Sequence, residues 1–303
     1  MQQAWQIGPL ALLGLVQPDQ AVPAVTFGRA LADVLLLAVA GYGAYLWLKW
    51  FRSWRKGDRD FVPLCFHRRV PRESPPIPLA PILLAGFWVA SSLGSTLFRT
   101  ASVEDLADGF PDISVLMTSI ILVPVGISIV LLILWEYSGE KFRPRDYFLD
   151  PGWRAELQAG VELMLLAMPA TILLGMLSTL WKTEDELHLL LRMLQSERDP
   201  QLLLVIVTSA TLIAPLFEEL LFRVLLLNGM MQQGRLSPVP AVWLVSAFFC
   251  LGHGIHDAMQ LFPLSLCLGW CLVKRQSYVA LICGHALFNG FMLTLTLLYY
   301  SGQ

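Results

Sequence analysis

The chain has 303 residues, of which 56% are hydrophobic and only 15% are charged. Soluble globular domains usually carry about 25% charged residues, so this composition argues against a soluble protein. The chain carries 21 Lys and Arg residues against 23 Asp and Glu residues, which gives a formal net charge of −2. Because phosphate backbones select proteins with a basic surplus, we expect no nucleic-acid partner.

Long apolar stretches predict how the chain crosses a lipid bilayer. About 20 apolar residues cross the hydrocarbon core as a helix, because no water is present there and each backbone amide must pair within its own segment. The stretches are 30–51, 79–98, 114–135, 157–181, 201–231, 239–256, 258–273 and 277–300. They predict an all-α fold, a polytopic transmembrane bundle of about eight helices. The seventh stretch is short, so it could be tilted, re-entrant or fused to the sixth.

The Lys and Arg residues predict the orientation of this bundle, since cytoplasmic loops retain them. Most of them fall in the inner connections if the amino terminus lies outside. We therefore expect a multi-pass integral membrane protein with both termini non-cytoplasmic, in the cell membrane if the source is bacterial. The apolar stretch 5–16 is too short to span and lacks the basic start of a signal peptide, so we expect it to lie at the interface.

Ionisable side chains inside the predicted helices are few. Each costs roughly 2.5 to 3.5 kcal/mol on insertion scales, so each needs a reason. They are Asp33, Glu162, Glu218, Glu219, Arg223, His253, His256, Asp257 and His285. We expect Asp33 and Glu162 at the helix starts near the surface, the latter together with Glu156. His256 and Asp257 read as a polar pair at a helix end.

Glu218 is the residue of this group that lacks a partner on its own helix. Glu219 and Arg223 are four residues apart, share a helix face and can form an ion pair. Glu218 points about 100° away from Glu219 and must find its partner across the bundle. Candidates are His253, with Phe249 one turn before it, and His285, with Asn289 one turn after it. Counting about 1.5 Å per residue from the inner helix ends places these groups at comparable depth.

Such a cluster predicts hydrolytic chemistry. A carboxylate beside an imidazole in a shielded cavity can act as general base towards water, and His and Asn side chains can donate hydrogen bonds to the oxyanion that forms. The reaction implied is hydrolysis of an acyl bond, with a peptide bond favoured. No serine or cysteine nucleophile with an adjacent base stands out.

Three motifs carry a resemblance to a known family. Glu218-Glu219-x-x-x-Arg223, Phe249-x-x-x-His253 and His285-x-x-x-Asn289, in this order on successive late helices, resemble those of the CAAX protease and bacteriocin-processing (CPBP, or Abi) family of intramembrane proteases. The type II CAAX prenyl endopeptidases belong to this family. The resemblance covers roughly 146–303, predicted as the protease domain, and leaves 1–145 as an N-terminal transmembrane region of unknown role.

The resemblance also implies a role for each motif residue. Glu218 would be the catalytic base, His253 would position the water, and His285 with Asn289 would form the oxyanion site. Glu219, Arg223 and Phe249 would support them. Val224 departs from the pattern, because many members carry glycine after the arginine.

Metal use is left with two readings. Glu218, His253 and His285 could supply a zinc site with an open position for water. The zinc signature HExxH is absent, however, and the resemblance implies that some relatives act as glutamate proteases. We therefore expect no required cofactor, with zinc as the alternative.

Other functions compete with an endopeptidase. The same side chains could form a structural ion network in a catalytically silent scaffold or immunity protein. They could also form the relay of a proton-coupled transporter, although no inverted repeat is seen. The partners expected of the enzyme are the lipid bilayer and a peptide or membrane-protein substrate, such as a prenylated CAAX tail or a leader peptide.

Overall fold

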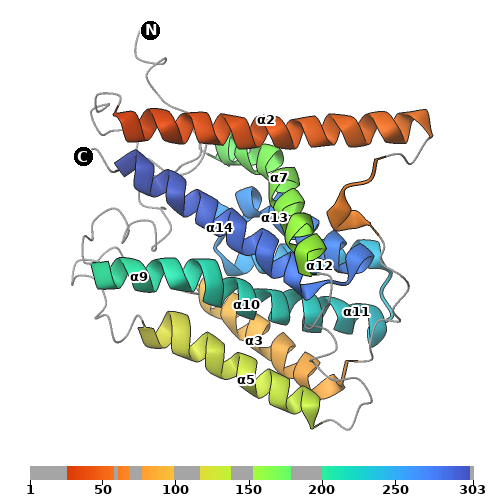
Figure 1. The fold of residues 1–303 in the computed structure, drawn as a ribbon. Coiled ribbons are helices and arrows are strands. Elements are labelled where there is room, and N and C mark those ends of the chain that lie inside the picture. Colours follow the sequence, from red (N-terminus) through yellow and green to blue (C-terminus); the bar gives the residue numbers. More distant parts are fainter. Residues whose placement is uncertain are drawn as a thin grey trace.

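The structure is a computed structural model that describes residues 26–57, 61–67, 77–98, 117–137, 153–178 and 200–300. Every regular element in these ranges is a helix, and the helices form one bundle (Figure 1). The predicted all-α helical fold is therefore confirmed. The expectation for 5–16 lies outside the described residues.

The first half of the chain contributes four helical segments and one short turn. Their bounds are α2 (Phe27–Lys56), η1 (Leu64–Phe66), α3 (Leu79–Phe98), η3 (Thr118–Leu122) continuing into α5 (Val123–Glu136), and α7 (Trp153–Ser178). Of these, η1 is a single 3₁₀ turn and η3 is a π-helical start of α5. The segments match the first four predicted stretches.

The second half contains one long composite rod and three further helices. The rod joins α9 (Pro200–Thr208), η5 (Ser209–Ile213), α10 (Ala214–Glu218), η6 (Glu219–Leu227) and α11 (Asn228–Gln232). It is followed by α12 (Pro238–Gly252), α13 (Ile255–Arg275) and α14 (Tyr278–Tyr300). Both η5 and η6 are π-helical, so the rod passes from α to π winding twice and returns to α each time.

Five helices of the described residues are long and apolar enough to cross a membrane. They are Phe27–Lys56, Thr118–Glu136, Trp153–Ser178, Pro200–Gln232 and Tyr278–Tyr299. The chain is thus an integral membrane protein by the length and composition of its helices. The apolar part of α3, Leu79–Gly94, and all of α12 are shorter.

The predicted boundaries of the sixth and seventh helices are wrong. α12 ends at Gly252 and has 15 residues, which at about 1.5 Å per residue gives about 22 Å, short of a hydrocarbon core of about 30 Å. α13 has 21 residues and is the longer of the two. Gly254 separates them with a φ of +96°, a backbone conformation open to glycine and not to other residues. The chain therefore turns at His253 and Gly254, where the sequence pattern suggested a continuing helix.

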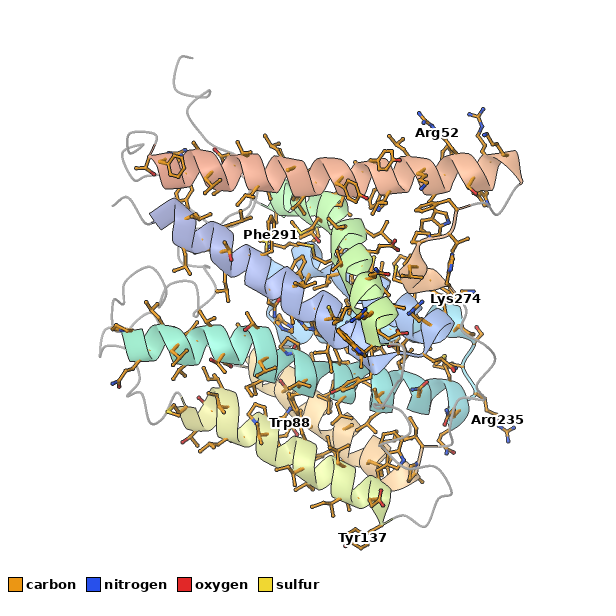
Figure 2. All side chains as sticks on the ribbon, viewed as in Figure 1. Arg52, Trp88, Tyr137, Arg235, Lys274 and Phe291 are labelled. Atoms are coloured by element: carbon orange, nitrogen blue, oxygen red, sulfur yellow. The ribbon has the colours of Figure 1, made fainter. Side chains whose placement is uncertain are left out.

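Basic residues gather towards one end of the bundle. Figure 2 shows Arg52, Arg235 and Lys274 at the same side of the view. At the other end of α2, the Arg29 guanidinium lies 4.9 Å from the ring centre of Tyr299 in α14. These placements agree with the predicted alternation of the helices. Which end is cytoplasmic stays a prediction.

α7 is the central helix, and α2, α13 and α14 pack against it. Gly160 of α7 allows a close approach of α14, because a Cβ there would lie 2.7 Å from the Cβ of Cys283. The Trp47 indole of α2 donates a hydrogen bond to the Leu166 carbonyl of α7 at 2.9 Å. Small residues and interhelical hydrogen bonds are the usual means by which membrane helices associate.

A buried ion pair ties α7, α13 and η1 together. Arg275 bonds both carboxylate oxygens of Glu156, at 2.7 and 2.9 Å, and also donates to the Leu64 carbonyl at 2.8 Å. The backbone N–H of Leu64 donates to Glu162. Glu156 lies in the first turn of α7, as expected, but its side chain is fully buried. The reason is tertiary, since its partner lies 119 residues further along the chain.

Cys65 follows Leu64 in η1 and packs in the hydrophobic core. It is fully buried, and burial raises the pKa of its thiol. A neutral thiol behaves as a small apolar group, so Cys65 packs and does not react. Cys271 of α13 is equally buried, in agreement with a packing role for the Cys267 and Cys271 face.

Candidate active site

The π-helical segment of the composite rod leaves the Ala210 carbonyl without a hydrogen bond from its own helix. In a π-helix the carbonyl of Ala210 would bond the amide five residues on, which is Pro215 and has no N–H. The backbone N–H of Ala214 donates to the Ser209 carbonyl. The Asn289 side chain of α14 donates to the Ala210 carbonyl instead, at 2.8 Å. Pro215, just before the first motif, thereby leaves a carbonyl acceptor that positions Asn289, the last residue of the third motif.

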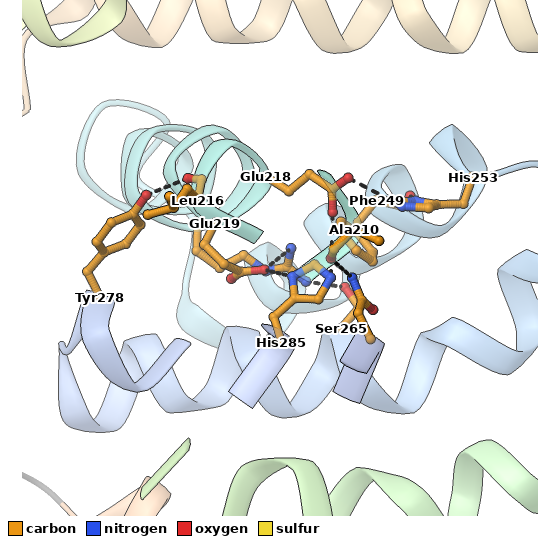
Figure 3. A network of polar contacts seen from close by, with 11 residues as sticks. Ala210, Leu216, Glu218, Glu219, Phe249, His253, Ser265, Tyr278 and His285 are labelled. Carbon is orange, nitrogen blue, oxygen red and sulfur yellow. Dashed lines mark hydrogen bonds and ion pairs between the residues drawn. The ribbon is translucent and has the colours of Figure 1, made fainter. Parts of the chain in front are cut away.

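Glu218 lies between the two motif histidines, as Figure 3 shows. Its Oε1 is 3.6 Å from Nε2 of His253, and its Oε2 is 3.6 Å from Nε2 of His285. Both distances exceed a normal hydrogen bond. Oε2 is also buried and makes no hydrogen bond in the described part of the chain. The carboxylate therefore lies within ion-pair distance of two imidazoles and beyond the length of a normal hydrogen bond to either.

His253 owes its position to the break after α12. It follows the last residue of that helix, and its Nδ1 lies 2.8 Å from the Phe249 carbonyl. A carbonyl can only accept, so Nδ1 carries the hydrogen of this bond. In the neutral imidazole, Nε2 is then a lone-pair acceptor that faces Oε1 of Glu218. Two acceptors at this distance leave a position for a donor that bonds both.

His285 is fixed from its other side. Its Nδ1 contacts Oε1 of Glu219 at 2.7 Å, and the same oxygen lies 3.2 Å from Nη1 of Arg223. All three side chains are buried. Because the partner of Nδ1 is a carboxylate, Nδ1 donates, and the ring is held with Nε2 towards Glu218.

Arg223 supports the site through two further contacts. Its Nη2 donates to the Ser265 hydroxyl of α13 at 2.7 Å. Its guanidinium lies 4.2 Å from the ring centre of Phe249, and that ring is 4.5 Å from the His253 ring and 5.8 Å from the His285 ring. Phe249 thus packs against the cation and both imidazoles.

Two cavities meet at Glu218. The larger has a volume of about 410 Å³ and is lined by Glu218, His253, His285 and Asn289 together with mostly apolar side chains. The smaller, about 130 Å³, reaches Glu218 from the side of Trp88 in α3. The wall of the larger cavity includes Ser119 and Ile120 of η3. Helices of the first half of the chain therefore help enclose the site.

Comparison with known proteins identifies the region that holds these side chains. Residues 200–291 match the family model described as Type II CAAX prenyl endopeptidase Rce1-like. The match covers less than a third of the chain, and we call residues 200–291 the Rce1-like region after it. No curated protein and no solved structure gave a match. The resemblance inferred from the motifs is confirmed over this range, and the Rce1-like region contains all three motifs.

The four predicted catalytic side chains, Glu218, His253, His285 and Asn289, all face the larger cavity of the Rce1-like region. Glu219 and Arg223 lie behind them, and Phe249 lines the cavity as well while it packs against the His253 ring. Their roles in a reaction stay a prediction. Val224, where glycine was expected, is fully buried in η6.

Sequence reasoning missed three polar residues around the Rce1-like region. Ser265 bonds Arg223, the Tyr278 hydroxyl bonds the Leu216 carbonyl, and Gln260 lines the larger cavity. None of them is charged, so a search for ionisable groups in the membrane passes over them. A search for any hydrogen-bonding side chain within an apolar helix would have found all three.

The side chains as arranged do not fit a zinc site. Among the described residues, no group of three His, Cys, Asp or Glu side chains is placed to hold a metal ion.

Proposed function

We propose that this chain is an intramembrane endopeptidase in which Glu218 activates water for attack on a peptide bond. The observation that carries the proposal is the placement of Glu218. Its carboxylate lies between two imidazoles, 3.6 Å from each, and lines a cavity of about 410 Å³. A carboxylate that is shielded, faces a cavity and keeps an oxygen free of hydrogen bonds within the described residues is suited to act as a general base.

The gap between Glu218 and His253 suits a single water molecule. Such a water can donate one hydrogen to Oε1 of Glu218 and the other to the lone pair on Nε2 of His253. Its oxygen then points a lone pair into the cavity. The water attacks the carbonyl carbon of the substrate while Glu218 takes the proton.

The oxyanion formed in this attack needs donors on the opposite side of the carbonyl. The imidazolium form of His285 can donate there from Nε2, while its Nδ1 stays bonded to Glu219. The Asn289 amide nitrogen has two hydrogens, and the contact with Ala210 uses one. Glu218 finally returns its proton to the leaving nitrogen as the C–N bond breaks, which gives a carboxylic acid and an amine.

The substrate we propose is a peptide that reaches the site from within or beside the bilayer. The family name supports a prenylated carboxyl-terminal CAAX tail, in which a lipid is carried on the cysteine. The mostly apolar lining of the larger cavity supports the same choice, since it can receive aliphatic side chains.

Purified protein in lipid nanodiscs, with a fluorogenic farnesylated CAAX peptide, tests the proposal. We expect Glu218→Ala and His253→Ala to abolish cleavage while both variants insert and purify normally. Asp33→Asn is the matched control, because it changes a membrane carboxyl group in α2, outside the residues that line the cavity. Turnover that survives Glu218→Ala would contradict the proposal.

A chelator separates the glutamate mechanism from a zinc mechanism. We expect cleavage to persist after treatment with o-phenanthroline and EDTA, since the donors as arranged do not converge on one point. Loss of activity on chelation that is restored by zinc would establish the alternative.

Two experiments address the non-enzymatic alternatives. Proton flux into proteoliposomes that depends on Glu218 would indicate a transporter. A cellular phenotype that is unchanged by Glu218→Ala would indicate a scaffold. Proteomic comparison of membranes that contain wild-type or Glu218→Ala protein identifies the natural substrate, because uncleaved precursors accumulate only with the variant.

A further inference from the structure

Gln260 of α13 carries a buried amide oxygen that bonds no described residue. The residue is 9% exposed, and its Oε1 is shielded and makes no hydrogen bond within the described part of the chain. It lines the same cavity as Glu218, His253, His285 and Asn289. An amide oxygen left unbonded in the interior costs free energy, so its retention calls for a partner that binds there.

Other glutamines of the chain show how a structural amide is treated. Gln232 at the end of α11 accepts a hydrogen bond from the backbone N–H of Ile77 at 3.0 Å. Gln233 beside it donates to the Ile77 carbonyl at 3.5 Å. These amides join the rod to the segment before α3. Gln260 makes no comparable link.

The surroundings of Gln260 point to the class of partner. The larger cavity is lined by apolar side chains over most of its wall, among them Ile120, Leu261, Phe288, Met292 and Leu293. Such a wall can take apolar side chains but cannot satisfy the amides of a peptide backbone. Each backbone unit brings one N–H donor and one C=O acceptor that need partners away from water.

We propose that Gln260 binds the backbone of the substrate peptide next to the bond that is cleaved. Its side-chain amide is the complement of a peptide group, because the oxygen accepts from a backbone N–H while the NH₂ donates to a backbone C=O. The terminal torsion of glutamine is soft, so the amide can turn towards a bound chain. This inference rests on the proposed function. It assigns the cavity an extended peptide with apolar side chains, held by Gln260 and cleaved at Glu218.

The test compares glutamine variants of the full-length protein in nanodiscs. Gln260→Leu and Gln260→Met remove the amide, and Gln232→Met is the matched control outside the cavity. The probes are a farnesylated fluorogenic CAAX peptide and the same peptide without the lipid. For the farnesylated peptide we expect both Gln260 variants to lower kcat/KM about 5- to 50-fold, mainly through KM, since up to two hydrogen bonds are lost.

Thermal unfolding supplies the readout that a structural role would change. We expect the unfolding midpoint of the Gln260 variants to equal or exceed that of the wild type, because an unbonded buried amide is replaced by an apolar group. Gln232→Met should lower the midpoint and leave KM unchanged. A lower midpoint with unchanged KM in the Gln260 variants would assign Gln260 to the fold and overturn the inference.

The two proposals fail in different ways. Cleavage that requires Glu218 but has the same KM in Gln260→Leu overturns the inference alone. Cleavage that survives Glu218→Ala overturns the proposed function. If the wild type cleaves neither peptide, the assigned substrate class is wrong and the inference falls with it.

Discussion

Two buried ionic clusters in this protein are built in opposite ways. At one, Arg275 and Glu156 are 4% and 0% exposed, and the guanidinium bonds both carboxylate oxygens and the Leu64 carbonyl. At the other, the Glu218 carboxylate is 18% exposed, and each of its oxygens stands 3.6 Å from an imidazole. The first carboxylate is fully bonded and closed to water. The second is held in place but left with capacity to bond.

The difference indicates where the chain uses its charges for structure and where it keeps them for chemistry. A charge that is buried and bonded on all sides fixes the packing of the helices that carry it. A carboxylate with unused lone pairs beside a cavity can accept a proton. Glu219 combines both features. It is buried and paired with an arginine like Glu156, and it also fixes the orientation of the His285 ring at the open site.

Of the variants considered, Glu218→Gln should have the largest effect on activity. The amide keeps the shape of the side chain but cannot take a proton from water, so we expect cleavage to fall by about 10²- to 10⁴-fold or more. The unfolding midpoint should stay the same or rise, since a poorly bonded charge is replaced by a neutral group. Peptide turnover and thermal unfolding of one preparation measure both. A large drop in the midpoint would place Glu218 with Glu156 as a structural residue.

Arg275→Met should have the reverse signature. It leaves the Glu156 carboxylate buried without its cation, which costs about 3 to 5 kcal/mol of stability. The double variant Arg275→Met with Glu156→Leu removes the stranded charge and should recover part of that loss. Yield and unfolding midpoints of the single and double variants check this. If the double variant is no more stable than the single one, the ion pair is not the cause.

Ser265→Ala tests the supporting layer between the two clusters. Arg223 loses its Ser265 acceptor but keeps Glu219, so we expect a loss of about 1.5 to 3 kcal/mol. A several-fold fall in kcat should accompany it, because Arg223 orients the group that holds His285. Thr296→Ala is the control, since that hydroxyl bonds only the Met292 carbonyl of its own helix turn. Equal losses of stability and kcat in the two variants would show that the Arg223–Ser265 hydrogen bond has no particular role.

The open site was the easier of the two clusters to predict from the sequence. Charges are scarce in the chain, so the few ionisable residues in late apolar stretches stood out, and the fourfold spacing of Glu219 and Arg223 indicated an ion pair. Glu218 was then left unpaired by helix geometry alone. The structure gives it the two histidine neighbours that this reasoning required.

The remaining features depend on contacts that a local pattern does not contain. Glu156 stands at the start of a helix, where a carboxylate usually faces water, and only its distant partner Arg275 explains its burial. The π-helical turn before Pro215 has no hydrophobic signature, because the residues are apolar in either winding. Gln260 is uncharged, and only the folded bundle shows that its amide oxygen bonds no described residue.

Gly254→Ala is the mildest way to disturb the open site. At a φ of +96° and a ψ of 148° an alanine is strained by about 1 to 3 kcal/mol, although a Cβ there would meet no atom within 4 Å. Relief of that strain moves the neighbouring His253, so kcat should fall more than KM rises.

Gly252→Ala is the matched control on the other side of His253, since it lies in α12 and a Cβ there would also meet no atom within 4 Å. It should keep full activity and gain slightly in stability, as alanine replaces glycine in a helix. If both variants lose activity equally, added bulk near the cavity is responsible. If only Gly254→Ala does, the backbone turn is what holds His253 opposite Glu218.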